Sequence, residues 1–184
     1  NQLLLRYNTQ VVEPPAGLNP AFRRSGHIHP LNTPAGRTLT AEFPPDHAHQ
    51  HGVFFAWGNT QFKGHKIDFW NQAGLTGTVR HKEVLRVLNS DDSARFEVVL
   101  EHVAFLPGEI EQVVLEEVWE VTAFPPSAAG FAVDLVSRQA NVGDAPLTLL
   151  KYHYGGMAFR GTSDWLGRDR SEFLTSEGLG RIEG

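Results

Sequence analysis

The chain has 184 residues, a length that fits one domain with a hydrophobic core of its own. Its net charge of −5 and scattered basic residues exclude the clustered basic face of a nucleic-acid-binding protein. No apolar run approaches the roughly 18 residues of a membrane span, and the absence of cysteine excludes disulfides and thiol catalysis. We therefore expect a soluble protein that binds neither nucleic acid nor membranes.

Residues 1–70 are irregular and rich in proline, histidine and aromatic residues. Short strands are predicted at residues 3–7, 38–43 and 53–57. Turn signals such as Pro14-Pro15 and Pro44-Pro45 separate them. We expect this part of the chain to contribute site loops.

Residues 75–160 show long stretches in which apolar and polar residues alternate. Period-two alternation is typical of strands, and it predicts four of them. Their residue ranges are 96–101, 113–121, 131–138 and 147–154. Pro107-Gly108, Pro125-Pro126 and Gly143-Asp144 are typical of hairpin turns. The pattern predicts an antiparallel meander.

Several predicted strands are partly apolar on their second face, for example at Val99, Val118 and Val136. A sheet with two partly apolar faces is normally covered on both sides. We therefore expect an all-β chain, an antiparallel two-sheet β-sandwich in one domain over residues 1–184, with further C-terminal residues missing from this sequence. The glutamates at 101, 116, 117 and 120 are expected on a solvated sheet face.

Five of the nine histidines fall between residues 27 and 51. If residues 46–52 are extended, His47, His49 and His51 lie on one face with Cα atoms about 6–7 Å apart, a spacing that suits a divalent metal such as zinc or iron. His27 and His29 form a second pair with the same i, i+2 relation. The alternative is that these histidines organise a proline-rich loop, without metal.

Aromatic and polar residues follow this histidine-rich stretch in the sequence. Trp57, Trp70 and Asp68 suit a carbohydrate, because sugar C–H faces stack on rings while hydroxyls need polar partners. Ordinary core packing is the alternative for both tryptophans. His153, near the end of a predicted strand, is a candidate acid or base, and Arg160 follows it.

Four segments of the chain carry a resemblance to a known family. They are residues 29–37, residues 44–52, Asp68-Phe69-Trp70 and Tyr152-His153-Tyr154-Gly155-Gly156. Together they resemble the PmoA-like bacterial family, which is labelled after a methane oxygenase subunit and has no secure activity. The resemblance spans nearly the whole chain.

A second resemblance rests on the order of three weaker elements. Gly36-Arg37, His51-Gly52 and the stretch from Asn141 to His153 are similar to features of the galactose-mutarotase-like supersandwich, the fold of the aldose 1-epimerases. This resemblance implies that His153 protonates the sugar ring oxygen and that His51 binds substrate. The glutamate base of that family would lie beyond residue 184.

These observations lead to three hypotheses about function. The first is a carbohydrate-processing enzyme with mutarotase-like acid–base chemistry, using His153 and His51 as catalytic residues and a small carbohydrate as substrate. Substrate-binding residues would be His29, His49, Asp68, Trp57, Trp70 and Arg160. The second is a metal-dependent hydrolase, lyase or oxygenase that uses His47, His49 and His51, and the third is a non-catalytic carbohydrate-binding module. The histidine-rich loops and the lack of cysteine favour a periplasmic or secreted location, and the oligomeric state is left open.

Overall fold

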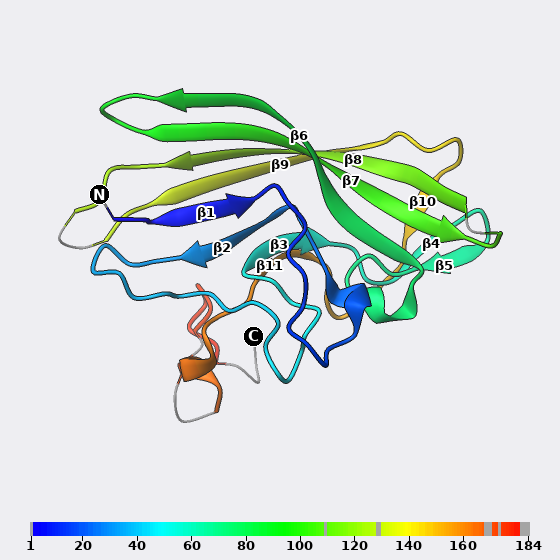
Figure 1. Ribbon diagram of the computed structural model, residues 1–184, viewed down its shortest axis with the longest axis horizontal. Helices are drawn as coiled ribbons and strands as arrows, with labels where there is room; N and C mark the ends of the chain where they lie inside the picture. The colour runs from blue at the N-terminus through cyan, green and yellow to red at the C-terminus, as the bar shows by residue number, and fades with distance from the viewer. Residues whose placement is uncertain (1, 109, 128–129, 168–170, 173, 181–184) are drawn as a thin grey trace.

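The computed structural model describes residues 2–108, 110–127, 130–167, 171–172 and 174–180. In these residues the chain forms three antiparallel sheets and no α-helix (Figure 1). Three short 3₁₀ turns, η1 (Pro20–Phe22), η2 (Gln72–Gly74) and η3 (Ser163–Trp165), interrupt the loops. The all-β prediction is confirmed, whereas the number of sheets is three. No helix in the described part of the chain is long and apolar enough to span a membrane.

The largest sheet is a meander of four strands in the order β6-β7-β8-β9. The strands are β6 (Gly77–Asn89), β7 (Ala94–Leu106), β8 (Ile110–Ala123) and β9 (Val133–Asn141). One face carries buried side chains such as Val98 and Trp119, which sit opposite each other in the β7–β8 register. Ion pairs cover much of the other face, including Arg95 with Glu120. The apolar face follows from the alternating sequence, whereas the ion pairs on the second face differ from the expected sheet that is covered on both sides.

A second sheet has the strand order β1-β2-β3-β11. Its strands are β1 (Leu5–Asn8), β2 (His27–Leu31), β3 (Val53–Ala56) and β11 (Gly156–Phe159). The third, smaller sheet has the order β10-β4-β5, with β10 (Leu147–Leu149), β4 (Thr60–Phe62) and β5 (His65–Ile67). Apolar side chains from all three sheets form one core cluster, among them Phe54, Phe62, Leu100 and Trp119.

The structure corrects several predictions about strands. The meander begins with residues 77–89 rather than 96–101, and the predicted strand at 147–154 is the short β10, which pairs with β4. Gly143-Asp144 therefore does not close a hairpin. Residues 38–43 form only isolated bridges, which pair Thr38 with Asn32, Thr40 with Gly161 and Glu42 with His51. The first 70 residues contain five strands, more than the three predicted there. Strands of three to five residues are too short to show a clear alternation of apolar and polar residues in the sequence.

Candidate functional site

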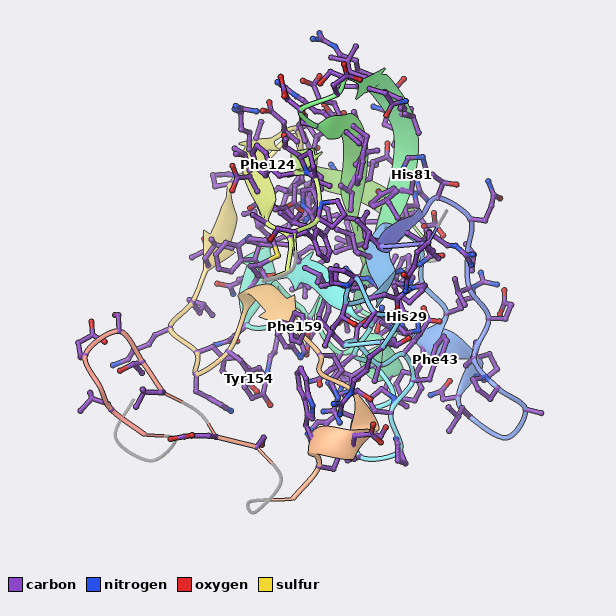
Figure 2. The ribbon with its side chains drawn as sticks, turned by 90° about the vertical axis from the view of Figure 1, so that its left-hand side faces the viewer. His29, Phe43, His81, Phe124, Tyr154 and Phe159 are labelled. Atoms are coloured by element: carbon purple, nitrogen blue, oxygen red, sulfur yellow. The ribbon has the colours of Figure 1, made fainter. Side chains whose placement is uncertain are left out.

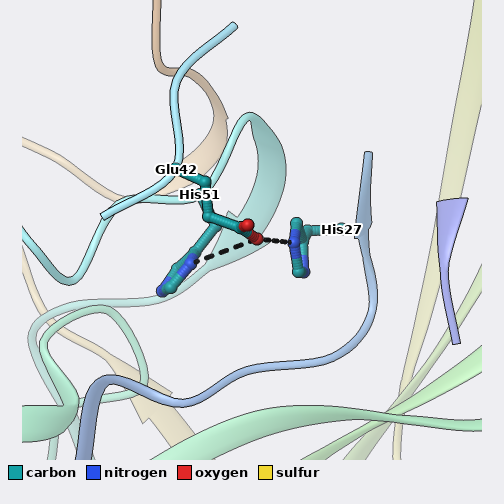
Figure 3. Close-up of side chains that lie close together, drawn as sticks. All are labelled: His27, Glu42 and His51. Carbon is teal, nitrogen blue, oxygen red and sulfur yellow. Dashed lines mark hydrogen bonds and ion pairs between the residues drawn. The ribbon is translucent and has the colours of Figure 1, made fainter. Parts of the chain in front are cut away.

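Two histidines and a glutamate that are far apart in the sequence meet in the interior (Figure 3). They are His27 at the start of β2, Glu42, and His51 just before β3, and their ligand atoms all lie within 4.8 Å of one another. His27 Nε2 lies 2.5 Å from Glu42 Oε1, and His51 Nδ1 lies 4.0 Å from the same oxygen. We call this group the His27–Glu42–His51 cluster.

A folded-back loop brings Glu42 and His51 together. The two residues form a β-bridge, and between them the chain turns through hydrogen bonds from His47 N to Pro44 O and from Gln50 N to His47 O. Gly52 follows with a positive φ of 52°. A Cβ at that position would lie 2.0 Å from the carbonyl oxygen of Ile28, so only glycine allows β2 to approach the loop this closely.

The two imidazoles of the cluster are fully buried. His27 and His51 have no exposed side-chain surface, and Glu42 retains 15%. His27 Nδ1 and both ring nitrogens of His51 have no hydrogen-bond partner. Burial lowers the pKa of His51 well below its usual value, and the nearby positive charge of Arg24 acts in the same direction. His51 is therefore neutral at pH 7, which is the state that binds a metal ion.

The donor set of the cluster suits a divalent transition metal. Two imidazole nitrogens and one carboxylate are the protein ligands of many catalytic zinc sites and of non-haem iron sites. Three protein donors leave coordination positions for water or substrate. The unpartnered buried nitrogens fit such an ion, because a buried polar atom without a partner is costly.

The structure does not bring His47 and His49 to this cluster. Residues 46–50 form turns instead of the extended segment that would place three imidazoles on one face. His47 is exposed and its Nδ1 bonds Asp46, whereas His49 is half-buried, with its ring 5.7 Å from that of His47. His51 alone of the three turns into the cluster with His27. The proline-rich turns around residue 45 account for the difference.

His29 lies beside the cluster on β2. Its Nδ1 is 2.9 Å from Thr40 Oγ1 and its ring is half-buried. Burial lowers the pKa of His29, and the negative charge of Glu42 opposes that shift. His29 is thus close enough to the cluster to interact with it electrostatically.

Arg160 and Asp68 are both occupied by contacts within the protein. Arg160 pairs with Asp46 at 2.5 Å and bonds Gln50 at 3.0 Å, which ties the histidine-rich loop to the end of β11. Desolvation raises the pKa of Asp46, but hydrogen bonds from Arg160 and His47 lower it to about 2. Asp68 Oδ1 accepts from the backbone N–H groups of Trp70 and Asn71, which fixes a turn.

His153 lies elsewhere, in a small cavity lined by aromatic rings. The cavity measures about 190 Å³, and we call it the aromatic cavity; its lining includes Trp57, Asn59, Tyr152, His153 and Tyr154. The rings of Tyr152 and Tyr154 lie 4.4 and 4.1 Å from that of His153. Figure 2 shows Tyr154 well apart from His29.

The expected pair of catalytic histidines therefore does not share one cavity. His51 is fully buried with its ring near those of His27 and Phe43, whereas His153 is exposed. Trp70, which is 7% exposed, packs between Phe54 and Tyr154. Trp57 lines the aromatic cavity, and its Nε1 donates to Gln139.

A second buried titratable pair lies inside the main sheet. His102 Nε2 is 2.8 Å from Glu117 Oε2, and neither side chain is exposed. Glu117 Oε1 also accepts from Trp119 Nε1 and Ser137 Oγ. Desolvation raises the pKa of Glu117, yet the hydrogen bond from His102 brings it below its usual value. Glu117 is therefore ionised in the core, contrary to the solvated face predicted for it.

Sequence reasoning missed Glu42 as a functional residue and used His27 only as half of a pair. Glu42 is the one carboxylate in the predicted strand at 38–43, directly before Phe43-Pro44-Pro45. The sequence feature that could have identified Glu42 is its position at the end of a predicted strand, shortly before the histidine-rich stretch. The pairing of residue 42 with residue 51 depends on the intervening turns, which the spacing of the histidines does not reveal.

Comparison with known proteins gives one result. A model described as "Family of unknown function (DUF6807)" matches residues 1–184. The chain belongs to the DUF6807 family. No curated protein and no solved structure matches the sequence.

Proposed function

We propose that this DUF6807 protein is a metal-dependent enzyme whose divalent transition metal binds at the His27–Glu42–His51 cluster. The observation that carries the proposal is that one ligand atom each from His27, Glu42 and His51 lie within 4.8 Å of one another in the interior, where neither ring nitrogen of His51 has a hydrogen-bond partner. This is the second hypothesis from the sequence with a different ligand set, in which His27 and Glu42 replace His47 and His49.

The chemistry follows from the donor set. When bound, such a metal acts as a Lewis acid on a substrate oxygen or lowers the pKa of a bound water. The chain's own residues supply one negative and two neutral donors. Thr40 fixes the His29 ring beside the cluster, and His29 is a candidate for holding or moving a proton there. A hydrolase, lyase or oxygenase reaction is compatible with this arrangement.

The test is metal binding by matched variants. Zn²⁺ and Fe²⁺ are added to metal-free protein, and bound metal per chain is measured by mass spectrometry after gel filtration. The wild type is expected to retain one ion, and Glu42→Gln and His51→Ala to lose it. His47→Ala is the control, since His47 is exposed and outside the cluster. A wild type that retains no ion, or a His47→Ala variant that loses it, would overturn the proposal.

We infer that carbohydrate binding in the aromatic cavity is a second candidate function. Tyr152 and Tyr154 are 46% and 49% exposed at its rim, next to the polar side chains of Asn59 and His153. Exposed rings with polar neighbours suit sugar rings. A mutarotase-like reaction with His153 as acid, on a galactose-mutarotase-like supersandwich, is the finer form of this proposal, and a binding module is its non-catalytic form.

Two substitutions distinguish the forms of the carbohydrate proposal. If the wild type binds a monosaccharide in isothermal titration calorimetry, Tyr154→Ala is expected to abolish that binding. His153→Ala is expected to slow anomer interconversion by roughly 10²–10⁴-fold if His153 transfers a proton, and to change no rate in a binding module. Unchanged sugar binding in Tyr154→Ala would remove the aromatic cavity as a carbohydrate site.

A further inference from the structure

The main sheet has two edge strands, β6 and β9, and neither has a neighbouring strand on its outer side in the described residues (Figure 1). An edge strand presents a row of unpaired backbone N–H and C=O groups, which is a template for pairing with another chain. Proteins oppose such pairing with bulges, proline and charged side chains, lysine in particular. The two edges of this sheet differ in these features.

β6 has the features of a protected edge. Its register with β7 shifts twice, between His81 and Glu83 and between Val84 and Arg86. Three exposed charged side chains, Lys82, Glu83 and Arg86, lie along the same stretch. Bulges increase the twist of an edge strand, and charges there oppose the approach of a further strand, so β6 is not expected to accept one.

β9 is a regular edge without bulges. Its register with β8 is continuous from Val133, opposite Ala123, to Asn141, opposite Leu115. Its sequence contains neither lysine nor proline, and alternate side chains are exposed, among them Val136 at 40%. A straight, partly apolar edge of 9 residues is suited to accept an added antiparallel strand.

The exposed charges of β9 are complementary to themselves. Asp134 and Arg138 flank Val136 symmetrically, and all three side chains are exposed on the same face of the strand. When two β9 strands pair antiparallel about a two-fold axis at Val136, each Asp134 lies opposite the Arg138 of the other copy. Arg138 lies 3.5 Å from Glu120 but its side chain remains 62% exposed, and Glu120 has a closer partner in Arg95 at 2.6 Å. No ion pair in the described part of the chain involves Asp134.

We propose that a second copy of this chain binds at the β9 edge, so that the two main sheets join into one antiparallel sheet with two-fold symmetry. A second copy fits better than an unrelated strand, because each Asp134 then meets an Arg138 and the interface contains two opposite-charge pairs. Val136 of one copy meets Val136 of the other at the centre of the outer face. The interface is small, so the dimer is expected to be weak and to depend on protein concentration.

The test is a charge swap across the proposed interface. Sedimentation velocity of the whole chain, over about a hundredfold range of micromolar concentrations, measures the dissociation constant of the dimer. Asp134→Arg and Arg138→Asp should each weaken the dimer about tenfold or more, because each substitution places like charges opposite each other twice. The double variant that carries both substitutions restores opposite charges in the same register and should dimerise like the wild type.

Glu83→Arg is the matched control, because it makes the same change of charge at an exposed position on the other edge, β6. It should leave the dissociation constant unchanged. The substituted side chains are all exposed, so each variant should melt cooperatively like the wild type. A wild type that stays monomeric at every concentration, a double variant that does not recover, or a dimer that Glu83→Arg weakens as much as Asp134→Arg would contradict the proposal.

Discussion

Glu117 lies in the core with three hydrogen-bond donors around its carboxylate. His102, Trp119 and Ser137 all donate to it, and none of the surface of Glu117 reaches solvent. A buried carboxylate of this kind is costly to remove, because all three donors then lose their acceptor.

We expect Glu117→Ala to lower the free energy of unfolding by about 3–5 kcal/mol, because the substitution removes the acceptor shared by three hydrogen-bond donors in the interior. The matched control is its neighbour Glu116, which faces solvent and pairs with Lys82 at 2.8 Å. Glu116→Ala should change stability by about 0–1 kcal/mol. Urea denaturation measures both values. Equal effects of the two substitutions would show that the interior network contributes little.

Burial of His51 also makes stability depend on pH. Its pKa in the folded protein is well below 6.5, so the unfolded chain binds more protons as the pH falls through that value. The contribution of His51 is therefore complete above about pH 6.5 and is lost progressively at lower pH. His29, His49 and His102 shift in the same direction.

The expected result is a free energy of unfolding that falls between pH 6.5 and 5, by at most about 1.4 kcal/mol per pH unit for each histidine. Urea denaturation of metal-free protein over this range measures it. In His51→Asn the slope should be smaller than in the wild type. A slope that the substitution leaves unchanged would show that His51 is not protonated on unfolding.

At the scale of elements, the loop from Glu42 to Gly52 decides whether the metal ligands meet. Its β-bridge pairs residue 42 with residue 51, and Gly52 lets that loop contact β2 at Ile28. The short strands β2 and β3 contribute His27 and the segment after His51. The ligands of the cluster thus come from elements whose contacts are non-local.

Gly52→Ala should therefore destabilise the protein by about 1–3 kcal/mol or more, from a strained φ and a clash with the Ile28 carbonyl. Gly74→Ala is the control, since nothing lies within 4 Å of a Cβ there. Thermal unfolding compares the two. If the variants lose the same stability, the approach of the loop to β2 is not constrained by Gly52.

For the whole molecule, the sequence predicted what depends on local alternation. The central strands β7 and β8 and the all-β class follow from period-two patterns at residues 96–101 and 113–121. The sheet partners of β10 and β11 cannot be predicted from such patterns, because their pairing with β4 and β3 is set by long-range packing. Glu117 was misassigned because it was grouped with Glu116, although successive strand residues face opposite sides.

The candidate site was predictable in the same partial way. His51 and the neighbourhood of His27 follow from the density of histidines before residue 52. The identity of the third ligand does not, since Glu42 reaches the cluster only after the turns at 44–50 reverse the chain. The spacing of histidines along one strand could not predict the ligand set, because the three ligands belong to different segments of the chain.

The central claim is that His27, Glu42 and His51 hold one metal ion. The most direct measurement is a crystal structure of zinc-loaded protein with anomalous data collected on both sides of the zinc absorption edge. The account predicts one anomalous peak in contact with all three side chains. A peak bound instead by His47 and Asp46, or an empty cluster in crystals that take up zinc elsewhere, would contradict it.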